Sequence, residues 1–137
     1  MPEHTTMTSC HWRYELKKIA KIRSIKFRLQ GGRCYYCCQP MWCEHPSRFA
    51  DAHGLSAAKI RQLQATAEHL LARCEGGRDT PENIVAACRF CNTRRHLAKH
   101  PLAPEAYARK VRSRLSKGLW HGVKLDRADE LLGPAPT

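Results

Sequence analysis

The sequence predicts a small α+β protein in which a short β-hairpin is followed by a helix, with basic helices on both sides. Two extended segments, at 65–72 and 83–87, flank a loop that contains Gly76 and Gly77. A helical pattern follows at 89–100 and ends before Pro101. Cys-x-x-Cys pairs stand before the first segment and directly after the second, which indicates that the two regions are tied together.

The N-terminal basic helix is predicted from the spacing of apolar residues between Trp12 and Gln30, which recur every three or four positions. Gly31 and Gly32 end the helix, since glycine readily takes the left-handed backbone found there. We expect one apolar stripe to pack on the core while basic residues cover the outer surface. The stripe consists of Trp12, Leu16, Ile19, Ile22, Ile25 and Leu29.

The remaining elements are read from turn and cap residues. Residues 33–43 predict a tight turn, and residues 44–54 predict a loop because they include Pro46 and Gly54. Ser56 is expected to cap a short helix that reaches Gln64. Pro104 opens a basic helix to about Lys117, and the tail from Asp126 forms one helical turn or none.

The charge points to a polyanionic partner. Twenty-four Lys and Arg residues against twelve Asp and Glu residues give a formal net charge of +12, which favours nucleic acid; a solvated basic surface without a partner is the alternative. No apolar run has the length of a membrane helix, and the first residues lack a signal-peptide pattern. We therefore expect a soluble, cytoplasmic protein without membrane contact.

The cysteines predict a structural zinc site. In an intracellular protein, cysteines are more often metal ligands or free thiols than disulfides. Two Cys-x-x-Cys turns supply the four thiolates that Zn²⁺ prefers, and these are Cys34, Cys37, Cys88 and Cys91. Cys38 could replace Cys37 as a ligand. A second site that includes Cys43 and His45 is conceivable, although free thiols are the simpler reading.

Further residues follow in a fixed order: Glu68-His69, then Gly76-Gly77, then Asn83-Ile-Val, then Cys-x-x-Cys-Asn ending at Asn92. This order resembles the HNH endonucleases of the His-Me finger group, in the subtype with a four-cysteine zinc site, over about residues 32–97. The resemblance implies a ββα-metal fold. It divides the chain into a helical extension at 1–31, a nuclease domain at 32–100 with an insertion at about 39–64, and a C-terminal part at 101–137.

The resemblance also implies a role for each of these residues. His69 would be the general base, and imidazole has a suitable pKa to take a proton from water near neutral pH. Glu68 and Asn92 would bind Mg²⁺ or Mn²⁺ through oxygen. Asn83 would brace the loop and orient His69 by a hydrogen bond. His96 lies one helical turn after Asn92 and would be a second metal ligand or a phosphate contact.

Two residues depart from the usual pattern of the family. Asn92 stands where the family name has its last histidine, and Glu68 stands where aspartate is more common. The longer glutamate could bind the ion through water or change the metal preference.

The expected function is a metal-dependent DNA endonuclease that leaves 5′-phosphate and 3′-hydroxyl ends, acting alone or as a homodimer. Arg94 and Arg95, which follow Asn92, and Lys17 and Lys21 of the first helix are candidate nucleic-acid contacts, with simple solvent exposure as the alternative. A zinc-knuckle protein that binds nucleic acid without catalysis is the rival function. A third possible function is a structural zinc module that binds another protein, but this function does not explain the positive net charge.

Overall fold

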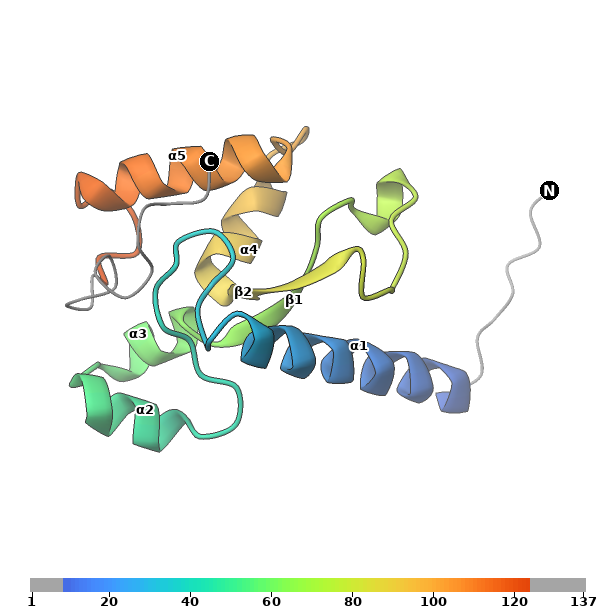
Figure 1. The fold of residues 1–137 in the computed structure, drawn as a ribbon, viewed down its shortest axis with the longest axis horizontal. Helices are drawn as coiled ribbons and strands as arrows, with labels where there is room; N and C mark the ends of the chain where they lie inside the picture. The colour runs from blue at the N-terminus through green and yellow to red at the C-terminus, as the bar shows by residue number, and fades with distance from the viewer. Residues whose placement is uncertain (1–8, 124–137) are drawn as a thin grey trace.

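The computed structural model describes residues 9–123. Its centre is an antiparallel hairpin of β1 (Ala65–His69) and β2 (Ile84–Cys88), with Ala65 opposite Cys88 and His69 opposite Ile84. Helix α4 (Arg89–Leu97) follows β2 without a break. The predicted order of strand, loop, strand and helix is confirmed, and the molecule is a small ββα-type α+β fold (Figure 1).

Helix α1 (Ser9–Leu29) contacts both strands and runs out past the hairpin in Figure 1. A helix of 21 residues spans about 31 Å, whereas a strand of five residues spans about 17 Å. The helix is therefore longer than the surface that it covers. The predicted apolar stripe is only partly buried: Ile22 is buried, but Leu16, Ile25 and Leu29 are exposed.

Residues 44–54 are not a loop, because most of them form helix α2 (Pro46–His53). Pro46 stands at the start of this helix, where proline is well tolerated, and Gly54 ends it in the left-handed conformation (φ 63°). The next helix, α3 (Ala57–Gln62), begins as predicted, since the Ser56 hydroxyl accepts a hydrogen bond from the Lys59 amide. The segment between the first cysteine pair and β1 thus contains two short helices.

Helix α5 (Pro104–Ser116) closes the core over the first cysteine turn and α4. The Tyr107 hydroxyl donates a hydrogen bond to the Cys91 carbonyl (2.6 Å), and its ring meets that of Tyr36 edge to face at 4.8 Å. Val111 of the same helix is fully buried. The predicted tail from Asp126 lies outside the described residues. None of the helices in the described part of the chain combines the length and the apolar character needed to cross a bilayer.

Candidate active site and cysteine cluster

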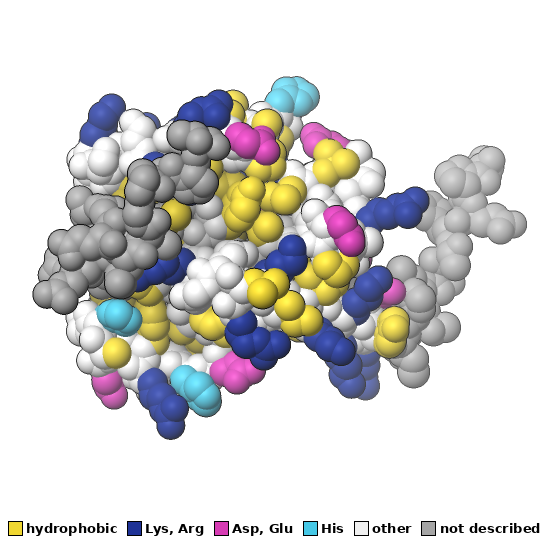
Figure 2. Space-filling model, in the orientation of Figure 1, with side chains coloured by type: hydrophobic (Ala, Val, Ile, Leu, Met, Phe, Trp, Pro, Cys, Tyr) yellow, Lys and Arg dark blue, Asp and Glu magenta, His cyan; other side chains and the backbone are white. Residues whose placement is uncertain are grey.

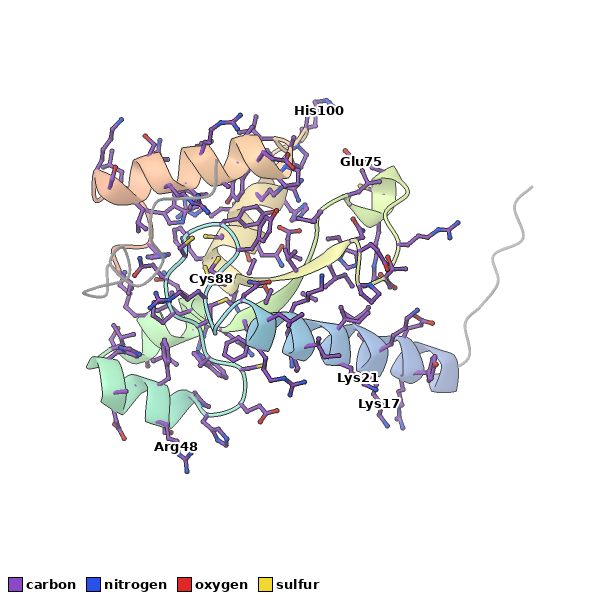
Figure 3. The ribbon with its side chains drawn as sticks, in the orientation of Figure 1. Lys17, Lys21, Arg48, Glu75, Cys88 and His100 are labelled. Carbon is purple, nitrogen blue, oxygen red and sulfur yellow. The ribbon has the colours of Figure 1, made fainter. Side chains whose placement is uncertain are left out.

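Four cysteines that are far apart in the sequence meet in one buried cluster. The sulfurs of Cys34, Cys37, Cys88 and Cys91 all lie within 4.8 Å of one another. Four sulfurs that share one Zn²⁺ at about 2.3 Å each would lie about 3.8 Å apart, so small adjustments are enough to hold an ion. The cluster joins the first turn to the junction of β2 and α4 (Figure 3, where Cys88 is labelled).

The surroundings of the cluster favour negatively charged sulfur. The amides of Tyr36 and Cys88 donate to the sulfur of Cys34 at 3.4 and 3.3 Å, and the Trp120 indole donates to the sulfur of Cys91 at 3.3 Å. Burial raises the pKa of Cys34, but hydrogen bonds from the other three thiols outweigh it and lower the pKa well below 9.0. Burial raises the pKa of Cys37 and Cys91 instead. A bound dication would stabilise the thiolate form of all four cysteines.

The structure selects Cys37 over Cys38 for the cluster. Cys38 takes a positive φ of 61°, and its sulfur accepts a hydrogen bond from the Arg112 guanidinium (3.3 Å). Cys43 also lies outside the four-cysteine cluster, with its sulfur 3.7 Å from the Ser24 hydroxyl. Among the side chains that the structure describes, residues 13–123, no second group of three or more His, Cys, Asp and Glu has metal-binding geometry.

Glu68 lies at the end of β1 with its side chain fully buried between β1 and α4. Its Oε1 accepts a hydrogen bond from Nε2 of His96 (2.7 Å) and lies 3.4 Å from Nη1 of Arg95. Its Oε2 is buried and has no hydrogen-bond partner, and the same holds for the neighbouring hydroxyl of Tyr36. Burial, and then the charge of Glu68, raises the pKa of Tyr36 above its ordinary value of 10.0.

Asn92 and His96 face β1 from the same side of α4. The Asn92 amide nitrogen donates to the Thr66 hydroxyl at 3.0 Å and to the Ala67 carbonyl at 3.2 Å. In the described part of the chain, the amide oxygen of Asn92 receives no hydrogen bond. The structure thus brings Glu68, Asn92 and His96 together, and they offer a carboxylate oxygen, an amide oxygen and an imidazole nitrogen. This donor set and the unpaired Oε2 fit a divalent cation.

His69 follows Glu68 on β1, and its imidazole points to different partners. Successive side chains of a strand point to opposite faces, so the ring of His69 does not follow Glu68 into the interface with α4. Its Nε2 lies 2.7 Å from Oδ1 of Asp79, which belongs to the loop between the strands. The side chain keeps 15% of its surface exposed. The ring is therefore held by the loop and can still be reached from solvent.

The comparison with known families covers these residues. Residues 56–97 match the family model described as HNH endonuclease. The chain contains an HNH domain. The match spans α3, both strands and α4, and it includes His69, Asn83 and Asn92. No curated protein and no solved structure matches the chain significantly. An HNH domain is a nuclease-type domain, so nucleic acid is the substrate class that it implies.

The side chain of Asn83 is bonded within the loop between the strands, and the hydrogen bond that the resemblance implies between Asn83 and His69 is replaced by one from another residue. The Asn83 side chain accepts from the Leu71 amide (2.8 Å) and donates to the carbonyls of Leu71 and Arg78, both at 3.0 Å. These three bonds join the two arms of the loop. The partner of His69 is Asp79 instead, and sequence reasoning missed it.

Gly77 is the tightest point of the same loop. A Cβ atom there would lie 1.8 Å from the Leu71 carbonyl oxygen, which is the atom that Asn83 binds. We expect Gly77→Ala to displace the loop and to cost about 3 kcal/mol of folding free energy, measured by chemical denaturation.

Gly76→Ala is the matched control for this substitution. Gly76 has a left-handed φ of 93° but open space around a Cβ, so its cost should stay near 1 kcal/mol. Equal costs for the two variants would contradict the close approach at Gly77.

The predicted nucleic-acid contacts lie in different environments, and the prediction that Arg95 contacts nucleic acid does not agree with its burial. Its side chain is 5% exposed, and its guanidinium donates to the carbonyls of His69, Leu70 and Leu102 at 3.0 to 3.2 Å. With its donors used in the interior, Arg95 supports the end of β1 and is not free to hold phosphate. Arg94 is exposed, with its guanidinium 4.5 Å from the centre of the Phe90 ring.

Lys17 and Lys21 are exposed on α1, where Lys and Arg side chains gather along one edge of the molecule (Figure 2). Figure 3 shows that both point to the side of α1 away from the hairpin loop, in which Glu75 is labelled. The two lysines are thus directed away from the loop that holds His69.

Proposed function

We propose that the protein is a metal-dependent endonuclease that hydrolyses DNA phosphodiester bonds and leaves 5′-phosphate and 3′-hydroxyl ends. One observation carries the proposal: within the HNH match, the end of β1 presents a solvent-reachable imidazole on His69 beside a buried carboxylate on Glu68 that keeps one oxygen unpaired. A general base and an anionic ligand for a cation are the two groups that such a hydrolysis needs first.

His69 is the general base in this proposal. Its free ring nitrogen takes a proton from a water molecule as the water oxygen bonds to phosphorus. The bond between phosphorus and the 3′ oxygen breaks, and this oxygen leaves as the 3′-hydroxyl after protonation by solvent. The attacking oxygen stays on the 5′-phosphate. Arg95 supports this arrangement by holding the carbonyl of His69, which fixes the strand end that carries the base.

Glu68, Asn92 and His96 would hold the catalytic cation, Mg²⁺ or Mn²⁺. When bound, the ion supplies positive charge against the scissile phosphate and the departing oxygen. Glu68 and His96 are joined directly by the 2.7 Å hydrogen bond, and Asn92 is fixed beside them by its bonds to Thr66 and Ala67. The guanidinium of Arg95, 3.4 Å from Glu68, balances part of the carboxylate charge and is expected to weaken the affinity for the ion.

The net charge of +12 favours nucleic acid as the substrate, and the choice of DNA rests on the resemblance to the HNH endonucleases. Arg94, two residues after Asn92, is the proposed phosphate contact. Lys17 and Lys21 would contribute only to DNA that extends around α1. The four-cysteine cluster is proposed to hold structural zinc, which joins the first turn to the strand and helix that carry the site.

The test is cleavage of supercoiled plasmid by the purified, zinc-loaded protein, with Mg²⁺ or Mn²⁺ added or omitted. We expect nicked plasmid first, because one domain carries one such site, and ligatable ends that confirm the 5′-phosphate. Linear product without a nicked intermediate would indicate that two copies act together. His69→Ala, prepared in parallel, controls for contaminating nuclease.

Salt-sensitive binding of DNA with no cleavage under any divalent cation would overturn the proposal. It would support the rival function, a zinc-knuckle protein that binds nucleic acid without catalysis.

A further inference from the structure

Asp79 contacts the candidate general base although no sequence motif points to it. Its Oδ1 lies 2.7 Å from Nε2 of His69 and 3.0 Å from Nε of Arg73, so two donors from the other arm of the loop converge on one carboxylate oxygen. The carboxylate is 23% exposed and the imidazole 15% exposed. The contact is therefore partly shielded from water, as an orienting hydrogen bond at an active site should be.

The chemistry of this contact decides which nitrogen of His69 carries the proton. A carboxylate only accepts hydrogen bonds, so the nitrogen 2.7 Å from it must be the donor. Burial raises the pKa of Asp79, but the hydrogen bond from His69 and the charge of Arg73 together outweigh it and bring the pKa below 3.8. Asp79 is thus ionised near neutral pH. Neutral His69 then carries its proton on Nε2 and keeps a free lone pair on Nδ1.

Contacts within the loop between β1 and β2 fix the position of Asp79. Arg73 begins the short 3₁₀ turn η1 (Arg73–Glu75), and its exposed guanidinium reaches back to Asp79. The residue before Asp79 is fixed from the other side, because the Asn83 amide donates to the Arg78 carbonyl at 3.0 Å. Nε of Arg73 also lies 3.4 Å from Nε2 of His69, within reach of a hydrogen bond. The carboxylate of Asp79 is the nearer acceptor for that N–H, at 3.0 Å, and it is negatively charged, so we assign the Arg73 proton to Asp79 and leave Nε2 of His69 as a donor. These contacts set the position of the carboxylate.

We propose that Asp79 is a positioning residue that holds His69 as the Nε2–H tautomer, with Nδ1 free to take the proton of the attacking water. This rests on the proposed function, in which His69 is the general base. A base that is oriented by a third group is the arrangement that activates nucleophiles in other hydrolases, where loss of the orienting carboxylate lowers turnover. Asp79 also stabilises the imidazolium that forms when the proton is transferred.

The experiment compares Asp79→Ala and Asp79→Asn with the wild-type protein. Asp79→Ala removes both the acceptor and the charge. Asp79→Asn keeps the size but loses the charge, and its amide can turn its N–H toward His69 and favour the other tautomer. Glu82→Gln is the matched control, since Glu82 is an exposed carboxylate in the same loop. Melting temperatures establish that all variants are folded.

Two readouts separate positioning from structural support. The first is plasmid cleavage, where we expect a fall of about 10- to 100-fold in kcat with little change in KM for both Asp79 variants, and none for Glu82→Gln. The second is the long-range ¹H–¹⁵N correlation spectrum of zinc-loaded protein at a pH above the histidine range, with His69→Ala for assignment. We expect the Nε2–H tautomer in the wild type and its loss in both Asp79 variants.

Cleavage by Asp79→Ala at the wild-type rate, or an Nδ1–H tautomer in the wild type, would overturn the proposal. Absence of cleavage by the wild type overturns the proposed function. The spectrum tests separately whether Asp79 holds His69 as the Nε2–H tautomer, so the two failures can be told apart.

Discussion

Replacing Cys88 by serine is expected to leave the protein unfolded and without zinc. Cys88 is fully buried, ends β2 and caps α4 by accepting a hydrogen bond from the Cys91 amide (3.4 Å). Structural zinc contributes on the order of 10 kcal/mol to folding, which is comparable to the whole stability of a small domain, about 5 to 15 kcal/mol. Loss of one of four ligands should therefore remove most of the stability. Circular dichroism and zinc content by mass spectrometry measure the result.

Cys38→Ser is the control for this prediction. Cys38 follows Cys37 directly but lies outside the cluster, so its variant should keep one zinc per chain and melt cooperatively. A chelator strong enough to remove zinc should unfold both the wild type and Cys38→Ser. A folded Cys88→Ser protein without zinc would contradict the structural role of the cluster.

Replacing His69 by alanine is expected to lower the rate of DNA cleavage by about 10² to 10⁴-fold. The substitution removes the proposed base and leaves Arg73 and Asp79 paired with each other at 3.0 Å, so the loop should keep its fold. Affinity for DNA should hardly change, because phosphate contacts dominate binding. Single-turnover cleavage and DNA affinity at the same salt concentration give the two quantities.

His100→Ala is the control for this substitution, since it removes an exposed histidine from the segment after α4. It should cleave like the wild type. Equal cleavage by His69→Ala and the wild type would exclude His69 as the base and would point to another nuclease in the preparation.

The elements around the hairpin could be predicted because local signals and tertiary packing agree there. The glycine pair and the short extended segments predict the turn and both strands, and Ser56 correctly predicts the start of α3. Helix α2 was missed for a physical reason. It is short and has no buried residue, so no apolar pattern predicts it, and Pro46 and Gly54 are typical of loops as well as of helix ends.

The site could be predicted only as far as sequence order and spacing describe it. The order of the residues predicts the HNH match, and the two Cys-x-x-Cys pairs predict the cluster. The identity of the partner of His69 depends on how the loop folds back, and ten residues of chain do not specify that. Arg94 and Arg95 are neighbours about 100° apart on a helix, so their order does not tell which one faces the core. Arg95 is buried, whereas Leu97 is 74% exposed.

The side chain of Gln30, just after α1, bears on how this protein behaves at high concentration. Its amide nitrogen donates to the Ala86 carbonyl at 2.8 Å, and its amide oxygen accepts from the Ala86 amide at 2.9 Å. The side chain thus makes the two hydrogen bonds that the backbone of a third strand would make to Ala86 of β2. A free strand edge is a template on which other chains can add and aggregate. With Ala86 already occupied, this small sheet presents no continuous row of open backbone groups along β2 for such growth.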